Sequence, residues 1–198
     1  MFTGIVSHQG SFRGYRKGRS ELAVEAPGLA ARIAPGGSVA VSGVCLSLAG
    51  AAGGELRFDL SRETLAKTTL GGLRPGDRLN LELPLTLEAP VGGHLVSGHV
   101  DGLGRVLRAS ARGGGRRLAV SFPSALRPYL IPKGSVAVDG VSLTVAALAA
   151  SSFEAELIPL TLSGTTLGAL RAGARVNLEC DMIGKYVYNW LSRGRESR

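Results

Sequence analysis

The feature that most constrains the fold is an internal repeat of about 97 residues. Residues 38–48 (SVAVSGVCLSL) match residues 135–145 (SVAVDGVSLTV) at seven of eleven positions, with an offset of 97. The same offset aligns residues 64–82 with residues 161–179 at thirteen of nineteen positions, and TGIVSHQG (3–10) aligns with SGHVDGLG (97–104) at an offset of 94. Blocks that share an offset are difficult to obtain by chance, so the chain is a tandem duplication.

The duplication sets the expected domain boundaries. We expect a first domain over residues 1–90 and a second over residues 91–181, each close to the common domain size. Residues 182–198 remain as a tail, in which Ile183, Tyr186, Val187 and Trp190 recur at roughly helical spacing. The tail therefore predicts a C-terminal helix whose apolar face packs on a partner subunit or on a neighbouring barrel.

Within each copy, apolar and polar residues mostly alternate over five to eight residues, and PGG, PKG, RPGD and RAGA interrupt the pattern. This is typical of short antiparallel strands joined by tight turns. Only LAARI (29–33) and LRPYL (126–130) indicate brief helices. The expected fold is mainly β, with two tandem homologous six-stranded antiparallel β-barrels and the C-terminal helix.

Composition argues against several classes of protein. The formal charge of +8 would suit a nucleic-acid-binding protein, but the dense basic stretches 13–19 and 112–117 are interleaved with glycine and aromatic residues make up only 5%. Hairpin loops explain these stretches better than an RNA site does. Two cysteines are too few for a disulfide framework, and nothing near Met1 resembles a signal peptide. We therefore expect a soluble, cytoplasmic protein.

Strand alternation locates a polar face in each copy. In VCLSL (44–48), Cys45 and Ser47 point to the face opposite the apolar residues, and Ser142 and Thr144 hold the same positions in the second copy. Two interpretations remain open at this point: a polar pocket wall in each half, or a side of the strand that faces solvent. A duplicated barrel favours two related ligand sites.

Two of the three histidines, His94 and His99, lie five residues apart in GGHLVSGHVDG (92–102). On a strand they would point to opposite faces, and on a helix they would lie about 140° apart, so the spacing argues against one shared metal. No CxxC or HxxxH spacing is present, and we expect no metal. His99 aligns with Ile5 of the first copy, so a barrel does not require it, and it is the better catalytic candidate.

The segments MFTGIV, GVCLSL, GGHLVSGHVDG, KGSVAVDGVSLTV and VNLECDMIGKYV together closely resemble the riboflavin synthase family of the alpha-chain type, in collinear order over nearly the whole chain. The resemblance implies two lumazine-binding barrels per chain in a homotrimer held by the C-terminal helix, with association with lumazine synthase as a further expectation. It also implies transfer of a four-carbon unit between two molecules of 6,7-dimethyl-8-ribityllumazine. The products are riboflavin and 5-amino-6-ribitylaminouracil, and no cofactor takes part.

The resemblance places substrate-binding residues in both copies. For the first-barrel site these are Phe2, Thr3, Gly4, Ile5, Val6, Cys45, Leu46, Ser47, Asp59, Leu60, Ser61, Arg62, Glu63 and Thr64. For the second-barrel site they are Gly98, His99, Val100, Lys133, Ser142, Leu143, Thr144, Ile158, Pro159, Leu160, Thr161, Leu162, Ser163 and Asp181. Phe2 and Thr3 are expected to shape the mouth of the pocket.

The reaction needs proton transfer at the C7 methyl group of one lumazine and a nucleophile at C7 of the other. We expect His99 to move the protons, because a histidine pKa lies near neutrality, and His94 to have a lesser, orienting role. Cys45 is expected to serve as proton donor or transient nucleophile, and Ser38 to orient a nucleophile.

The chain departs from the family pattern at Ser42, Ser47 and Leu160 and in the linker after Leu83. A non-catalytic carrier of lumazine or flavin with the same duplicated fold is the alternative function. Such carriers typically lose GGHxxxGH, which this chain keeps at residues 92–99.

Overall fold

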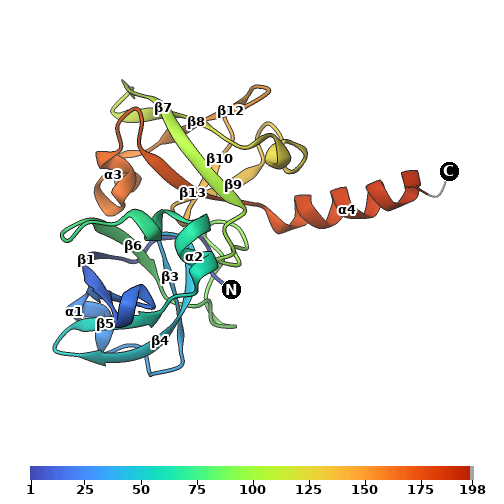
Figure 1. Ribbon diagram of the computed structural model, residues 1–198. Helices are drawn as coiled ribbons and strands as arrows, with labels where there is room; N and C mark the ends of the chain where they lie inside the picture. The colour runs from blue at the N-terminus through green and yellow to red at the C-terminus, as the bar shows by residue number, and fades with distance from the viewer. Residues whose placement is uncertain (197–198) are drawn as a thin grey trace.

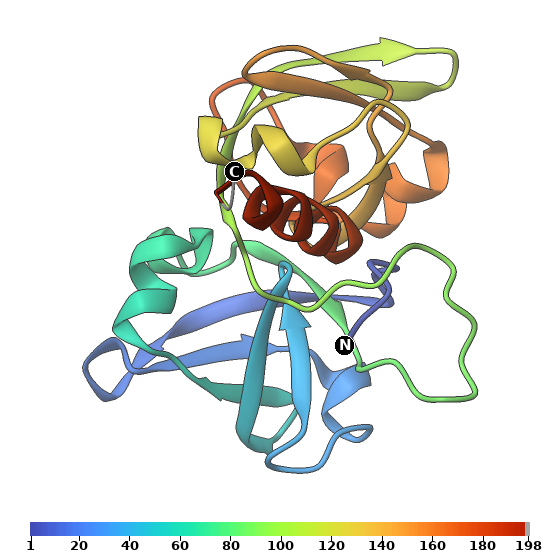
Figure 2. The ribbon, with the colours of Figure 1, turned by 90° about the vertical axis from the view of Figure 1, so that its right-hand side faces the viewer.

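The computed structural model describes residues 1–196 and shows two stacked β-structures, one per repeat, from which a long C-terminal helix projects (Figure 1). The expected mainly β class is confirmed. The two repeats lie one above the other in two perpendicular views, and the linker between them stands out as a loop (Figure 2).

The first repeat forms a closed antiparallel barrel with the strand order β1-β2-β5-β4-β3-β6, as the sequence predicts. Its strands are β1 (His8–Arg16), β2 (Glu21–Glu25), β3 (Ser38–Val41), β4 (Val44–Ala52), β5 (Glu55–Asp59) and β6 (Arg78–Glu82). Its short helices are η1 (Lys17–Arg19), α1 (Pro27–Ala30), α2 (Arg62–Lys67) and η2 (Thr69–Gly72).

The second repeat forms a seven-stranded sheet with the order β10-β9-β13-β7-β8-β12-β11. Its strands are β7 (Gly102–Arg112), β8 (Gly115–Ser121), β9 (Ser135–Val138), β10 (Val141–Thr144), β11 (Ala147–Leu148), β12 (Ser152–Leu157) and β13 (Arg175–Cys180). Its short helices are η3 (Ser124–Tyr129), α3 (Pro159–Gly164) and η4 (Thr166–Ala169).

The strands of the two repeats have the same order around the barrel. The second repeat is open where its equivalent of β4 is divided into β10 and β11. The break falls at Val145 and Ala146, next to the position where β4 carries a register shift between Leu48 and Gly50. A bulge leaves a residue outside the ladder, and in the second repeat this interruption ends the strand. The prediction of six strands was therefore right for the first repeat and wrong for the second.

Each repeat has its own apolar core, and strand alternation decides what enters it. In β4, Val44, Leu46 and Leu48 are buried, whereas Cys45 is half-buried and Ser47 is exposed. The brief helices predicted at 29–33 and 126–130 are present, although α1 and η3 both begin two residues earlier. Pro27 at the first turn of α1 accounts for its earlier start.

The two repeats meet across an approximate two-fold relation that the sequence offset makes visible. The Asn80 side chain donates to the Asp139 carbonyl at 2.9 Å and accepts from Thr166 N at 2.8 Å. Asn177 makes the reciprocal pair of bonds, both 2.8 Å long, to the backbone of the first repeat. Both asparagines are only 1% exposed, so these bonds fix the relative position of the barrels in a dry interface.

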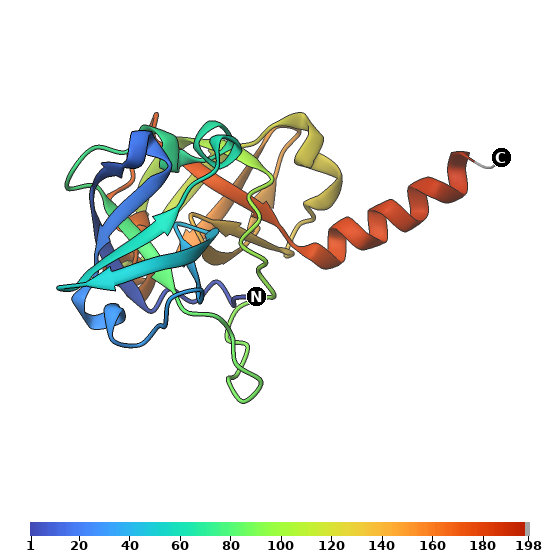
Figure 3. The ribbon, with the colours of Figure 1, turned by 60° about the horizontal axis from the view of Figure 1, so that its bottom comes forward.

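The predicted C-terminal helix is present as α4 (Met182–Glu196), and it runs away from both barrels (Figure 3). Its apolar side chains remain exposed, with Tyr186 at 75% and Trp190 at 79%. Its N-terminal half contacts the second repeat through an edge-to-face contact of Tyr188 with Tyr129 and an ion pair of Lys185 with Asp101. Packing of these exposed side chains on a partner subunit or on a neighbouring barrel stays a prediction. Among the described residues no helix is long and apolar enough to cross a membrane.

Candidate functional site

The segment that opens the first repeat is held by a buried carboxylate. Glu82, at the end of β6, accepts hydrogen bonds from Thr3 N at 2.6 Å, from the Thr3 hydroxyl at 2.7 Å and from Gly4 N at 3.0 Å. Burial raises the pKa of Glu82, and these hydrogen bonds oppose the shift. The carboxylate thus turns the chain sharply at Gly4.

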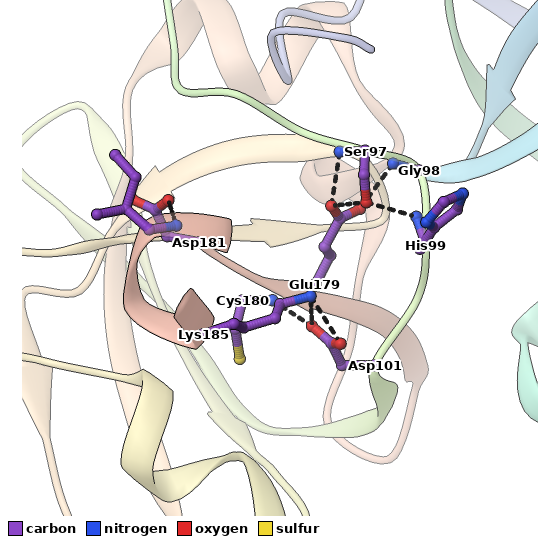
Figure 4. A network of polar contacts seen from close by, with 9 residues as sticks. Ser97, Gly98, His99, Asp101, Glu179, Cys180, Asp181 and Lys185 are labelled. Carbon is purple, nitrogen blue, oxygen red and sulfur yellow. Dashed lines mark hydrogen bonds and ion pairs between the residues drawn. The ribbon is translucent and has the colours of Figure 1, made fainter. Parts of the chain in front are cut away.

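The segment that opens the second repeat is held in the same way. Glu179, at the equivalent position in β13, accepts from Ser97 N and from the Ser97 hydroxyl at 2.7 Å each, and from Gly98 N at 3.0 Å (Figure 4). His99 N then donates to the Ser97 hydroxyl oxygen at 3.2 Å. The backbone at His99 is therefore fixed by its own repeat.

Beyond these carboxylates, each segment crosses to the other barrel. The Gly98 carbonyl accepts from Cys45 N in β4, and the Gly4 carbonyl accepts from Ser142 N in β10, both at 2.8 Å. Both glycines have positive φ, +83° and +74°, and a Cβ atom on them would lie 2.5 Å from the Cβ of Cys45 and 2.7 Å from that of Ser142. Only glycine allows both the backbone conformation and the close approach.

The crossing corrects the expected grouping of segments. Val100 packs against the core of the first barrel and Val6 against that of the second. The family resemblance predicts residues 4–6 at the first-barrel site and residues 98–100 at the second. The structure exchanges them, because each opening segment is anchored in one barrel and pairs with the other.

The first-barrel surface therefore combines β4 with the His99 segment. Cys45 and Ser47 share the outward face of β4, and Ser38 lies opposite Ser47 in the β3–β4 ladder. His99 is exposed on the adjoining segment. The expected catalytic residues Cys45 and Ser38 thus lie on neighbouring strands. His99 directly follows Gly98, whose carbonyl accepts from Cys45 N.

Residues 59–64, also expected at this site, begin at the last residue of β5, and β5 pairs with β4. Ser61 caps α2 by accepting from Thr64 N at 3.0 Å, and its hydroxyl lies 2.9 Å from the Thr64 hydroxyl. The backbone N–H and the hydroxyl of Thr64 are therefore both engaged by the Ser61 cap.

The second-barrel surface carries a pair that the sequence did not predict. His94 Nδ1 lies 2.7 Å from the Ser142 hydroxyl, while its buried Nε2 has no hydrogen-bond partner among residues 1–196. Burial lowers the His94 pKa, against the opposing effect of the Asp181 carboxylate. A neutral imidazole on a serine hydroxyl can take a proton through that hydroxyl. Because 48 residues separate the pair, no local sequence pattern could have revealed it.

The other residues expected at this surface surround β10. Lys133 has φ +65° and donates its backbone N–H to the Val145 carbonyl at 2.8 Å, next to the exposed Thr144. Residues 158–163 form the start and body of α3, where Ile158 and Leu160 are 58% and 75% exposed. Both are apolar side chains that a covering surface could bury.

Phe2 does not lie at a pocket mouth, so the expectation is wrong for Phe2, whereas Thr3 lines a cavity together with Ile5 and Glu82. Phe2 is fully buried in a small cluster with Ala40, Val96 and Ala137 between the barrels, and it pairs with Val96 in a short bridge. Thr3 is 7% exposed because Glu82 holds it.

The two cysteines have different environments. Cys180 is 1% exposed, and burial raises the pKa of its thiol to about 12, so it is an inert core residue. Cys45 is half-buried beside Gly98. Within the described residues no group of three or more His, Cys, Asp or Glu side chains could hold a metal.

Asp139 gives the barrel interface a pH dependence. It lies in the turn before β10 and accepts from Asn177 N at 2.8 Å, and burial raises its pKa to about 7. The unfolded chain releases this proton near the ordinary value of 3.8, so the native state loses stability as the pH rises from about 4 to about 7.

We therefore expect Asp139→Asn to unfold like the wild type at pH 4 and to be more stable at pH 8, by up to about 4 kcal/mol. Asparagine keeps the acceptor oxygen and tolerates the φ of +45° at this position. Urea unfolding at several pH values measures the difference. Parallel stability curves for the two proteins would show that Asp139 does not titrate in this range.

Comparison with known proteins shows the family to which the chain belongs. Residues 3–84 and 97–181 match the family model of the lumazine binding domain. The riboflavin synthase of Mycobacterium tuberculosis is 40% identical over 193 residues, which cover 94% of this chain and 96% of that protein. The riboflavin synthase of Chlamydia pneumoniae is 39% identical, with 98% and 96% covered, and that of Bacillus subtilis is 34% identical, with 100% and 93% covered.

Solved structures share the fold at lower identity. LumP complexed with riboflavin superimposes with a TM-score of 0.84 at 21% identity, covering 91% of this chain and 99% of LumP. LumP complexed with 6,7-dimethyl-8-(1'-D-ribityl) lumazine gives a TM-score of 0.81. The two matched lumazine binding domains and the full-length relatives together show that the chain belongs to the riboflavin synthase family.

Proposed function

We propose that the chain is a transferase that converts two molecules of 6,7-dimethyl-8-ribityllumazine into riboflavin and 5-amino-6-ribitylaminouracil. The reciprocal crossing of the two opening segments carries the proposal. It builds two surfaces of the same backbone design in one chain, each with a polar strand face and a glycine carbonyl on that strand. Two like sites suit a reaction in which both substrates are the same molecule, because holding them in register supplies much of the rate.

The side chains divide the work unequally between the two surfaces. His99 lies beside the Cys45 contact on the first surface, and the His94–Ser142 pair lies on the second. We assign proton transfer at the C7 methyl group to His99, and we assign to His94 the positioning of the Ser142 hydroxyl. Cys45 supplies a proton or acts as a transient nucleophile, and Ser38 orients the nucleophile.

Both surfaces are open in the single chain, which supports assembly. Ser47, Thr144 and His99 are exposed, and α4 presents an uncovered row of apolar side chains. We propose a homotrimer in which α4 holds the subunits together and the first barrel of one subunit covers the second barrel of its neighbour. Domain boundaries at residues 1–90, 91–181 and 182–198, a cytoplasmic location and association with lumazine synthase belong to the same proposal.

The test is to mix the purified protein with 6,7-dimethyl-8-ribityllumazine and to follow riboflavin by its absorbance and fluorescence. Riboflavin and the pyrimidine product should appear in equal amounts. Stoichiometric binding of lumazine without turnover would instead favour a carrier. Indifference to lumazine would overturn both functions.

A further inference from the structure

Two residues after His99, the Asp101 side chain connects the His99 segment to the base of helix α4. Its two carboxylate oxygens each lie 2.7 Å from Lys185 Nζ in the first turn of α4. One of them also accepts from Cys180 N at 2.8 Å, at the end of β13 and two residues before the helix (Figure 4). The Lys185 and Asp101 side chains are 27% and 21% exposed, so the ion pair is partly shielded from water.

The stretch 97–101 is thereby held at both ends by the same short region of the chain. Glu179 holds Ser97 and Gly98, while Cys180 and Lys185 hold Asp101. Figure 4 shows the two sets of bonds one above the other, with His99 to the right of the upper set. These bonds link the backbone that carries His99 to the end of β13 and to the first turn of α4.

Comparison of the repeats separates what a barrel needs from what this site adds. The carboxylate at Glu179 recurs as Glu82, but the position of Asp101 is Ser7 in the first repeat. Ser7 N donates to the Leu81 carbonyl just as Asp101 N donates to that of Leu178. The backbone path is thus formed without a carboxylate, and the Asp101 side chain is free for another role.

Only the second repeat has both His99 and Asp101, and only this repeat leads into α4. The first repeat has Ile5 and Ser7 instead and continues into the linker. Asp101 accordingly occurs only in the repeat that also contains His99, the proposed proton-transfer residue, and that leads into α4, the proposed assembly helix.

We propose that Asp101 is a positioning residue that ties the His99 segment to α4, so that the seating of α4 on another subunit also sets the position of His99. The inference rests on the proposed function, in which His99 transfers protons and α4 assembles the subunits. Asp101 does not touch the reacting atoms. It acts through the backbone of residues 99–101, and displacements of about 1 Å are enough to slow a reaction strongly.

The kinetic test breaks the tie from each side in the full-length protein. Asp101→Asn keeps an acceptor for Cys180 N and loses the charge, and Lys185→Met keeps the aliphatic stem. Each should lower kcat about tenfold and leave KM and the dissociation constant for riboflavin within about twofold, because the Gly98 backbone contact is intact. The double variant should be no slower than the single ones, since both remove one link.

Arg108→Met is the matched control. Arg108 pairs with Glu154 at 2.9 Å on the same repeat, away from α4, so its loss removes an ion pair of similar length and should leave kcat unchanged. Additive losses in the double variant, an unchanged kcat, or a fall in kcat that only follows lost ligand affinity would each overturn the proposal.

A spectroscopic test detects the link between Asp101 and α4 without measuring activity. The chain has three histidines, so selective 15N-histidine labelling gives three backbone amide signals. Asp101→Asn and Lys185→Met should shift the His99 amide and leave the His8 amide in place, and Arg108→Met should shift neither. A His99 amide that stays in place in both tie variants would overturn the proposal. If the wild type makes no riboflavin, the proposed function fails, whereas this measurement still decides whether the tie exists.

Discussion

His99→Gln is expected to lower kcat for riboflavin formation at least about 100-fold, the usual contribution of a positioned general acid or base. His99 is exposed on the segment that crosses to β4, and its backbone N–H is already satisfied by the Ser97 hydroxyl. Glutamine preserves a polar side chain of similar length but cannot take up a proton near neutral pH. The fold should therefore survive while the proton transfer is lost.

Three measurements make this expectation specific. Steady-state kinetics should place the loss in kcat, and fluorescence titration should show lumazine affinity close to that of the wild type. His8→Gln is the matched control, because His8 lies on β1, outside the proposed site, and its ring hydrogen-bonds to the neighbouring Ser7 hydroxyl. A His99 variant with wild-type turnover would move the proton-transfer role to the His94–Ser142 pair.

How far the sequence predicts this protein depends on the range of the interactions involved. The repeat, the alternation in 44–48 and the C-terminal helix are local or periodic patterns, and the structure contains all three. The break between β10 and β11 is also local, yet alternation continues through it, so periodicity alone could not reveal it.

The site was predicted less well because its contacts are distant in sequence and cross between repeats. The family resemblance places residues 4–6 beside their own barrel, whereas hydrogen bonds from Ser142 and Cys45 exchange the two segments. Phe2 was expected at a pocket mouth because it opens a recognisable motif, but a small apolar cluster between the barrels buries it. Side-chain type predicted which residues matter, and only the three-dimensional arrangement showed which of them meet.

The exchange itself can be tested with one methyl group. Gly98 and Gly36 have the same φ of +83°, but a Cβ atom at Gly36 meets nothing within 4 Å, whereas one at Gly98 lies 2.5 Å from Cys45 Cβ and 2.9 Å from Cys45 N. Alanine at either position carries the strain of the left-handed conformation, about 1 kcal/mol. Only Gly98→Ala adds a clash between the crossing segment and β4.

Gly98→Ala should therefore destabilise the protein by about 2–4 kcal/mol in urea unfolding and lower kcat/KM at least about 100-fold, whereas Gly36→Ala should cost about 1 kcal/mol and leave kcat/KM within about twofold. The rate at which a thiol reagent modifies Cys45 gives a local readout, because Cys180 is 1% exposed and should react slowly in the native state. Gly98→Ala should raise that rate by separating the segment from β4, and Gly36→Ala should not. Gly98 belongs to the second repeat and Cys45 to the first, so a changed Cys45 reactivity is expected only if the segments cross. Equal effects of the two alanines on stability, activity and Cys45 reactivity would mean that left-handed strain alone is responsible and that the crossing contact contributes nothing.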